Sequence, residues 1–430
     1  MRVCQLHRVP CAPQVIADFR EDSPTFGRWC GVLLTEHNKK QVFVPARCGH
    51  GFFTFEDNTC ALYLQEGTFN PPTEADTHPF DPLFQVAWPV PKGVTPVMSA
   101  KDIAAPILSV RRPHLATRTP RGRILVIGAS GQVGGSLLES FGPDNCIGTY
   151  CGTPVTGMVP FDLAKCAMNP QLATDLLECC YPTCVCICAG FTWVDGCENK
   201  PAHANLMNCA GPAAVAAAAK AMGIKTVWYS TDYVFDGPAG HPPYAESDTP
   251  APPNVYGSSK LAGEAAVLAA DPDALVIRTN VVWGPEGAGK NFIYQLCRNL
   301  EAGKPMNVPV DQIGTPTYNR DLADATKLLV EANASGIVNV GGIEPLGRLE
   351  FAQMAVAALN ELRGPHATPL NPALLIGVTT SNAGQAAKRP LGSGLTLDKV
   401  FALIPNWRPH SVKDGLKHWM ANPRGKALGQ

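Results

Sequence analysis

The sequence predicts an α/β protein in which a doubly wound parallel sheet carries a small C-terminal substrate lobe and follows a short all-β segment. Two observations predict the sheet. After residue 123, apolar runs of strand length alternate with helical stretches, and a glycine-rich turn directly follows the first of these runs. A third observation predicts the leading segment, because residues 1–95 contain short apolar runs broken by Pro, Gly and Asp-Asn turns.

The β segment is assigned to residues 1–110, with strands such as Val15-Ile-Ala, Gly31-Val-Leu-Leu and Gln41-Val-Phe-Val. No long helical period occurs in it. Residues 93–121 mix Pro, Gly and basic side chains around one short apolar segment. We therefore place a linker at residues 111–121.

The α/β part is assigned to residues 122–422, and residues 423–430 form a tail. Strands that are apolar throughout are typical of a parallel sheet covered by helices on both faces. The predicted strands are Ile124-Leu-Val-Ile-Gly, Cys146-Ile-Gly-Thr-Tyr, Cys184-Val-Cys-Ile-Cys, Thr226-Val-Trp-Tyr-Ser, Ala274-Leu-Val-Ile-Arg and Ile337-Val-Asn-Val, with clear helices at 212–222 and 260–268. Beyond residue 285 the alternation weakens, so helices at 320–331 and 349–362 are expected in the substrate lobe.

Composition and charge exclude some functional classes. The chain has 35 Lys and Arg against 36 Asp and Glu, so it has no net electrostatic attraction for nucleic acid or a membrane surface. Residues 1–19 lack the apolar core of a signal peptide, and no stretch reaches the roughly 18 apolar residues that span a bilayer. We expect a cytoplasmic protein with reduced cysteines. Cys184, Cys186 and Cys188 alternate along one strand as apolar core residues, and no metal site is predicted.

A glycine-rich turn, Gly128-Ala-Ser-Gly131-Gln-Val-Gly134, lies between the first strand of the α/β part and a helix. Glycines let the backbone approach a pyrophosphate, and the helix N-terminus presents N–H groups and the positive end of its dipole. This position in an alternating pattern predicts a Rossmann-type dinucleotide site. Its residues are Gly128, Ser130, Gly131, Gln132, Val133 and Gly134.

Cofactor preference is left open between NADPH and NADH. The second strand ends in Thr149-Tyr-Cys-Gly152, without the acidic residue that usually binds the adenosine ribose of NAD and without a clear Arg for a 2′-phosphate. Asp162, followed by Leu163, could face the adenine or cap a helix, and both roles remain open. Ala189 and Gly190, directly after the strand near 184–188, complete the predicted cofactor set.

A carbonyl-reducing group is predicted between residues 230 and 260. Tyr256 lies four residues before Lys260, which places both on one helical face, and Thr231 ends the fourth predicted strand, where ligands bind in such sheets. A protonated Tyr256 can donate to a carbonyl oxygen, Lys260 can stabilise the resulting phenolate and hold the nicotinamide ribose, and Thr231 can hydrogen-bond the same carbonyl oxygen. The hydride comes from the cofactor.

Residues 122–420 resemble the dTDP-4-dehydrorhamnose reductase family of extended short-chain dehydrogenases. The motifs are Ser-Thr-Asp-Tyr-Val-Phe-Asp-Gly (230–237), Asn-Val-Tyr-Gly-Ser-Ser-Lys-Leu-Ala-Gly-Glu (254–264), Arg278-Thr279, Lys290-Asn-Phe and Arg389-Pro390 ahead of Leu395. The resemblance implies reduction of the C4 ketone of a dTDP-4-dehydro-6-deoxy sugar, with catalytic Thr231, Tyr256 and Lys260 and with Asp232 and Tyr233 beside the sugar. The family's Trp that packs on the sugar is replaced here by Val281.

The N-terminal part resembles the second half of dTDP-4-dehydrorhamnose 3,5-epimerase, a cupin-like β-barrel enzyme of the same pathway. The resemblance lies in residues 23–34, 45–52, 62–63, 88–89 and 99–106. Where that family has a Tyr-Tyr pair, this chain has Thr68-Phe69, and His50 is interpreted as structural, so we expect no epimerase activity. Because half a barrel leaves strand edges unpaired, this segment should pack on the reductase part or on a second subunit in a homodimer.

A non-catalytic function is the alternative. Residues 232–237, followed by Pro-Pro-Tyr-Ala-Glu (242–246) and Pro-Ala-Pro (250–252), also resemble the regulatory β subunit of methionine adenosyltransferase. Such a subunit would bind the dinucleotide and a methionine adenosyltransferase without reducing a sugar. Thr231, where that family tends to have Ser, and the epimerase-like segment favour the reductase.

Overall fold

The computed structural model describes most of the chain, and its contacts divide it into two units. The described residues are 2–6, 12–23, 25–35, 39–55, 59–65, 75–81, 83–84, 86, 88, 90, 94–115, 124–155, 157–180, 182–363 and 367–421. One unit comprises Met1–Gly122 and Asp175–Tyr181, and the other comprises Arg123–Thr174 and Pro182–Gln430. Thr68 and Phe69, residues 116–121 of the predicted linker and the tail at 423–430 lie outside the described residues.

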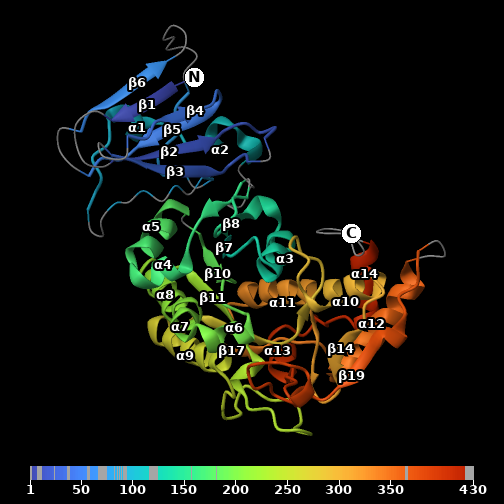
Figure 1. Ribbon diagram of the computed structural model, residues 1–430. Helices are drawn as coiled ribbons and strands as arrows, with labels where there is room; N and C mark the ends of the chain where they lie inside the picture. Colours follow the sequence, from blue (N-terminus) through green and yellow to red (C-terminus); the bar gives the residue numbers. More distant parts are fainter. Residues whose placement is uncertain are drawn as a thin grey trace. The chain divides into compact units, whose positions relative to one another are not determined.

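The smaller unit is built from two antiparallel sheets (Figure 1). One sheet has the order β4 (Val42–Val44), β1 (Arg2–Leu6), β6 (Ala61–Gln65), and the other has the order β3 (Trp29–Leu34), β2 (Ala12–Asp18), β5 (Cys48–Phe52). Short helices α1 (Ala100–Ala104) and α2 (Leu108–Arg111) follow. Val15, Trp29, Phe84, Leu108 and Leu115 form one of its apolar clusters, so this unit has a core of its own.

The larger unit contains a seven-stranded parallel sheet with the order β17-β12-β11-β10-β7-β8-β9. Its strands are β7 (Ile124–Ile127), β8 (Cys146–Tyr150), β9 (Val159–Pro160), β10 (Cys184–Ile187), β11 (Lys225–Thr231), β12 (Leu275–Thr279) and β17 (Gly336–Asn339). The doubly wound fold is confirmed. The two-residue β9 was missed because it is too short to show a pattern, so Thr231 ends the fifth strand of this sheet and not the fourth.

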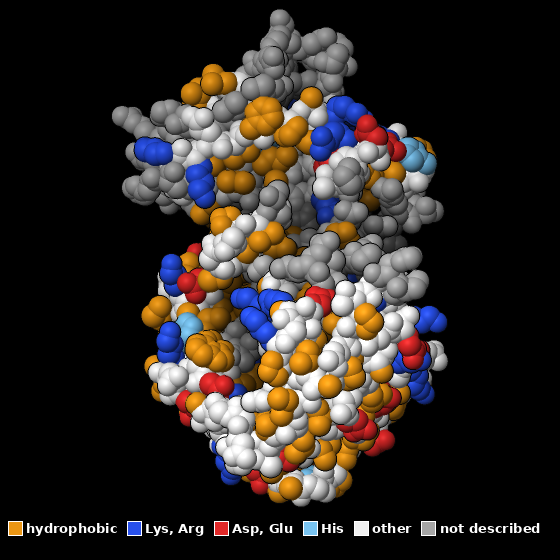
Figure 2. Space-filling view, turned by 45° about the vertical axis from the view of Figure 1, so that its right-hand side comes forward, with side chains coloured by type: hydrophobic (Ala, Val, Ile, Leu, Met, Phe, Trp, Pro, Cys, Tyr) orange, Lys and Arg blue, Asp and Glu red, His pale blue; other side chains and the backbone are white. Residues whose placement is uncertain are grey.

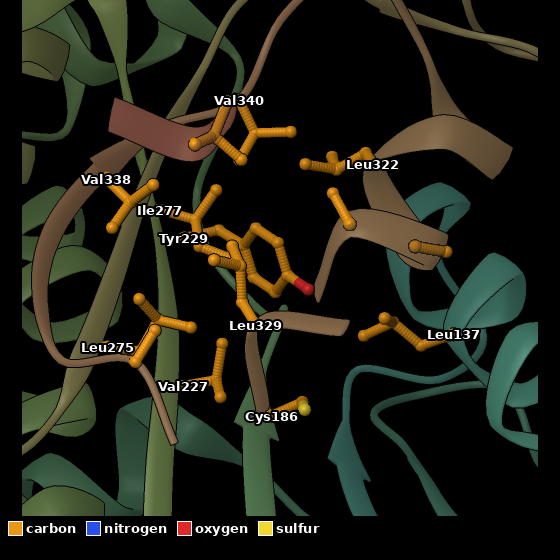
Figure 3. Packing of buried hydrophobic residues seen from close by; sticks show 14 of the residues in the cluster. Leu137, Cys186, Val227, Tyr229, Leu275, Ile277, Leu322, Leu329, Val338 and Val340 are labelled. Atoms are coloured by element: carbon orange, nitrogen blue, oxygen red, sulfur yellow. The ribbon is translucent and has the colours of Figure 1, made fainter. Parts of the chain in front are cut away.

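Helices cover both faces of this sheet (Figure 1). On one face lie α3 (Gln132–Phe141) and α11 (Asn319–Glu331), and on the other lie α4 (Leu163–Met168), α8 (Gly211–Ala221) and α9 (Val255–Ala270). Figure 3 shows Leu137 of α3 and Leu322 and Leu329 of α11 packed against strand residues, with the Tyr229 ring among them. The Tyr229 hydroxyl reaches the Thr326 hydroxyl at 2.8 Å, which satisfies a polar group inside the core.

The C-terminal lobe has a second core. Helices α10 (Phe292–Glu301), α12 (Arg348–Leu362) and α14 (Val412–Ala421) pack around β14 (Met306–Pro309), which pairs in parallel with β19 (Leu375–Val378). Trp283 and Phe351 lie buried in this cluster. Figure 2 shows that acidic and basic side chains are interspersed on one face of the larger unit. Among the described residues, no helix is long and apolar enough to cross a membrane.

A buried ion pair joins two strands of the sheet to α9. Arg278 on β12 donates from Nε and Nη2 to the two carboxylate oxygens of Glu264 at 2.8 and 2.6 Å. The Ser230 hydroxyl on β11 donates to the same carboxylate at 2.6 Å. The two charged side chains are only 2% and 3% exposed, so each depends on the other for charge compensation.

Substitution of one partner of this pair should strongly destabilise the chain. Glu264→Gln or Arg278→Met leaves a buried charge without compensation, and we expect each to lower the free energy of unfolding by about 3–5 kcal/mol. The double substitution should cost less than the sum of the two. Chemical denaturation followed by tryptophan fluorescence measures these changes.

The matched control is Glu361→Gln, which breaks the exposed pair between Glu361 and Lys413. Exposed pairs contribute about 0–1 kcal/mol, so this variant should unfold close to the wild type. Equal effects of Glu264→Gln and Glu361→Gln would contradict the stabilising role of the buried pair.

Candidate active site

The turn after β7 brings two segments of backbone into close contact. Gly128 has φ +85°, and a Cβ on it would lie 2.7 Å from the backbone nitrogen of Ala189. A Cβ on Gly134 would lie 2.3 Å from the Gly128 carbonyl oxygen. Both positions require glycine, because the first has a left-handed backbone conformation and the second lets α3 pack directly on the turn.

The residues around this turn fit a dinucleotide pyrophosphate. Gly131 is the N-cap of the ten-residue α3 and offers no side chain to its N–H groups, while Ser130 beside it is exposed. Nε2 of Gln132 is buried without a hydrogen-bond partner among the described residues, which points to an acceptor on a ligand. The partly buried Val133 side chain packs against the core.

Asp162 and Leu163 are placed by the start of α4. One Asp162 carboxylate oxygen accepts from the backbone N–H groups of Ala164 and Lys165 at 3.0 and 3.2 Å. Asp162 is therefore the N-cap, the second of the two roles that its sequence allows. The Leu163 side chain is buried and lies against Gly211 at the start of α8, so it offers a cofactor only its backbone.

Ala189 and Gly190 follow β10, and the loop that they begin is held at Phe191 by Asn208, which the sequence did not predict as a site residue. The fully buried Asn208 amide accepts from the Phe191 N–H at 2.9 Å and donates to the Phe191 carbonyl and the Ser259 hydroxyl, each at 3.0 Å. Asn208 lies in a π-helical turn, Leu206–Ala210, a feature that is frequent at functional sites. It thereby ties the loop after β10 to α9.

The structure brings the three predicted catalytic residues together. Tyr256 and Lys260 lie one turn apart on α9, and all three side chains are at least nine-tenths buried. The Lys260 ammonium donates to the Tyr229 carbonyl oxygen at 2.9 Å and lies 4.7 Å from the Trp228 ring centroid. The Tyr256 phenol lies close to the Thr231 hydroxyl at the end of β11 and interacts with it.

Burial shifts the ionisation of these groups toward their neutral forms. Burial raises the pKa of the Tyr256 phenol well above its usual value, and the neighbouring Thr231 hydroxyl only partly opposes this shift. Burial also lowers the pKa of Lys260 to about 8, against the attraction of Glu264. At neutral pH the phenol therefore keeps its proton and the lysine is mostly a cation. This pair can donate a proton and stabilise the phenolate that remains.

Asp232 and Tyr233 lie in a short 3₁₀ turn directly after Thr231. The Asp232 side chain is buried, and its Oδ1 accepts from the Thr231 hydroxyl at 3.0 Å. The Tyr233 ring meets the Tyr256 ring edge-on, with centroids 5.6 Å apart. Both predicted substrate residues thus adjoin the catalytic group.

Two arginines beside this turn were not predicted as site residues. Both Arg348 and Arg389 interact electrostatically with Tyr233, and Arg348 also interacts with Asp232. Both guanidinium groups therefore lie near the site. Arg389 binds Asp195 at 2.9 Å but leaves a buried Nη1 without a partner among the described residues. Arg348 lies 4.1 Å over the Phe292 ring and has no carboxylate partner in the described part of the chain. Guanidinium groups whose positive charge is not fully balanced by carboxylates can bind an anionic ligand.

Val281 has a strained backbone. Its φ of +39° lies in the left-handed region, where a β-branched residue is an outlier. It follows Asn280, whose amide donates to the Ser393 carbonyl at 3.1 Å. The resemblance leads us to expect a Trp that packs on the sugar at this position. Val281 instead places a small side chain there, on a constrained loop. Among the described residues, no group of His, Cys, Asp or Glu could hold a metal ion.

Comparison with known proteins decides the family. The family model described as RmlD substrate binding domain matches residues 122–422. The dTDP-4-dehydrorhamnose reductase of Burkholderia thailandensis is 33% identical over 301 residues, which cover 66% of this chain and 95% of the relative. The chain belongs to the dTDP-4-dehydrorhamnose reductase family.

Other members of the reductase family agree with this assignment. The Escherichia coli reductase is 32% identical, and the match covers 66% of this chain and 94% of the relative. The crystal structure of the Bacillus anthracis reductase in complex with NADP has a TM-score of 0.60 and 29% identity, and it covers 70% of this chain and 99% of that chain. Residues 12–109 match the family model of dTDP-4-dehydrorhamnose 3,5-epimerase, which agrees with the N-terminal resemblance.

Adjacent glycines of α3 give a matched test of the dinucleotide site. Gly134→Ala places a Cβ against the Gly128 carbonyl and should displace the helix from the turn. The shifted turn should lose a hydrogen bond to the pyrophosphate, and such a bond to a charged group contributes about 1.5–3 kcal/mol. We therefore expect NADPH to bind roughly ten- to a hundredfold more weakly. Fluorescence titration with NADPH measures the change.

Gly135→Ala is the control, because its Cβ would meet its nearest neighbour, the Ala129 carbonyl oxygen, at 3.7 Å. Alanine is favoured over glycine within a helix by about 1 kcal/mol, so this variant should bind NADPH as the wild type does. Equal NADPH affinity in the two variants would contradict the predicted site.

Proposed function

We propose that the protein reduces the C4 ketone of a dTDP-4-dehydro-6-deoxy sugar, converting dTDP-4-dehydrorhamnose to dTDP-rhamnose with NADPH or NADH. The observation that carries this proposal is the convergence of Thr231, Tyr256 and Lys260 at the end of β11 in a chain of the reductase family. The NADP complex of the Bacillus anthracis relative supports a nicotinamide cofactor here.

The protein's own residues account for the proton transfer. When bound, the reduced nicotinamide supplies the hydride that goes to C4. Tyr256 donates its phenolic proton to the carbonyl oxygen, which becomes the C4 hydroxyl. Lys260, held by the Tyr229 carbonyl, stabilises the phenolate electrostatically. Burial strengthens this attraction, since few water molecules screen it.

The two arginines supply a site for the charged part of the substrate. A nucleotide sugar carries a diphosphate, and guanidinium groups bind phosphate oxygens with charge-assisted hydrogen bonds. Arg348 and Arg389 both lie near Tyr233, and Arg348 also lies near Asp232. We assign them to the diphosphate, with the deoxysugar between them and Tyr256.

The N-terminal segment has a structural function in this proposal. Its His50 bonds Gln14 at 2.9 Å within the sheet of β2 and β5, which suits a structural histidine. We propose that residues 1–110 are an inactive epimerase-like segment, that residues 122–422 carry the catalysis, and that the protein acts in the cytoplasm as a homodimer. Apart from the motifs at 232–237, 242–246 and 250–252, no feature of the described residues favours the alternative of a methionine adenosyltransferase subunit.

Replacement of Tyr256 by Phe tests the chemistry. Tyr256→Phe removes the proton donor and should lower kcat by about 10²- to 10⁴-fold, measured as dTDP-4-dehydrorhamnose-dependent loss of NADPH absorbance. Tyr294→Phe removes a phenolic hydroxyl from α10 in the C-terminal lobe. It is the control and should keep kcat near that of the wild type. A wild-type protein that turns over no 4-keto nucleotide sugar would contradict the proposed function.

Replacement of Arg348 by Gln tests the anion site. A hydrogen bond to a charged group contributes about 1.5–3 kcal/mol, so Arg348→Gln should raise KM for the nucleotide sugar by roughly ten- to a hundredfold. Because this binding is expected to be similar in the ground and transition states, kcat should change little. Arg298→Gln, at an exposed arginine of α10, is the matched control. An unchanged KM in Arg348→Gln would remove Arg348 from the diphosphate site.

A further inference from the structure

The Thr231 hydroxyl is already engaged in the structure. Its single proton is donated to Oδ1 of Asp232 at 3.0 Å, and its oxygen accepts from the Tyr233 N–H at 3.2 Å. The Tyr256 phenol also lies close to this hydroxyl. A hydroxyl has one proton and two acceptor lone pairs, so Thr231 in this state has no proton left for a substrate carbonyl.

The state of Asp232 decides where that proton goes. An ionised carboxylate only accepts hydrogen bonds, and it holds the Thr231 proton more strongly than a neutral ketone oxygen can. A protonated Asp232 can instead donate to the Thr231 oxygen. The Thr231 proton is then free to turn toward the ketone beside Tyr256.

The surroundings of Asp232 permit this change near neutral pH. The side chain is 1% exposed, and its Oδ2 is buried without a hydrogen-bond partner among the described residues. Burial raises the pKa of Asp232 to about 6, which Ser393, Thr231 and Asn280 partly oppose. The titratable and charged groups that interact with it are Tyr233 from its own turn, Tyr256 from α9 and Arg348 from the start of α12. Arg389 interacts with the next residue, Tyr233.

We propose that Asp232 is a positioning residue that switches the Thr231 hydroxyl between the carboxylate and the substrate ketone, and that the form competent for reduction has Asp232 protonated. This inference rests on the proposed function. No proton is consumed at Asp232, because the ketone takes its proton from Tyr256. Asp232 only determines whether Thr231 supplies the second hydrogen bond to the same oxygen.

The sign of the pH dependence follows from this assignment. Asp232 has a raised pKa, and its protonated form is the competent one, so activity is full below pH 5 and falls as the pH rises through about 6. Deprotonation of Lys260, whose pKa is about 8, produces a second and separate fall in activity at higher pH. The wild-type profile of kcat/KM for dTDP-4-dehydrorhamnose should therefore show two alkaline limbs.

The test compares this profile in the full-length wild type and in Asp232→Asn with NADPH at saturation. An amide does not titrate in this range, so the limb near pH 6 should vanish in Asp232→Asn while the limb near pH 8 remains. Asp236→Asn removes an exposed carboxylate four residues away and should keep both limbs. NADPH titration of each variant verifies that the cofactor site is intact.

Variants of Thr231 test the same inference independently of Asp232. Thr231→Ser keeps the hydroxyl and should keep the limb near pH 6, whereas the residual activity of Thr231→Val should lack it. A limb near pH 6 that persists in Asp232→Asn or in Thr231→Val would overturn this inference and leave the reductase assignment standing. Absence of turnover in the wild type would instead contradict the proposed function itself, and this inference with it.

Discussion

The ion pair between Glu264 and Arg278 fixes the elements that carry the reacting groups. It joins α9 to β12 directly and to β11 through Ser230. Tyr256 and Lys260 lie on the same helix, two turns and one turn before Glu264. Because neither charge can leave its buried partner without a large desolvation cost, α9 keeps its register against the sheet. That register places the Lys260 ammonium at the Tyr229 carbonyl and Tyr256 at Thr231.

Removal of water from this region also prepares the chemistry. Burial is the first cause of three pKa shifts, upward for Tyr256 and Asp232 and downward for Lys260. Each shift favours the neutral form, yet the Lys260 pKa of about 8 still leaves a cation at neutral pH. The low polarity that keeps the proton on Tyr256 also strengthens the attraction between Lys260 and a phenolate. Burial therefore keeps Tyr256 protonated before the reaction and stabilises its phenolate beside Lys260 afterwards.

The sequence predicted those features that local patterns encode. The long apolar strands, the glycine turn and the Tyr256–Lys260 spacing depend on neighbouring residues, and the structure places them as predicted. The sequence did not predict contacts between distant segments, such as the ion pair of Asp195 with Arg389 or the hydrogen bond of Asn208 with Ser259. The bond from Thr231 to Asp232 depends on a 3₁₀ turn, whereas sequence reasoning assigned that hydroxyl directly to the substrate.

Three buried polar atoms that lack a hydrogen-bond partner among the described residues lie in the three parts of the proposed site. Gln132 Nε2 lies at the dinucleotide turn, Asp232 Oδ2 belongs to the residue after Thr231, and Arg389 Nη1 lies where the diphosphate is assigned. Buried polar groups are normally satisfied, because each unsatisfied one costs about 1–3 kcal/mol. Other such atoms lie away from the proposed site, for example Trp283 Nε1 in the core of the C-terminal lobe and Arg278 Nη1 in the buried ion pair, so absence of a partner alone does not identify a site. These three differ in that each belongs to the dinucleotide turn or to the cluster around Tyr233. The protein thus leaves hydrogen-bonding capacity unused where cofactor, ketone and diphosphate are proposed to bind.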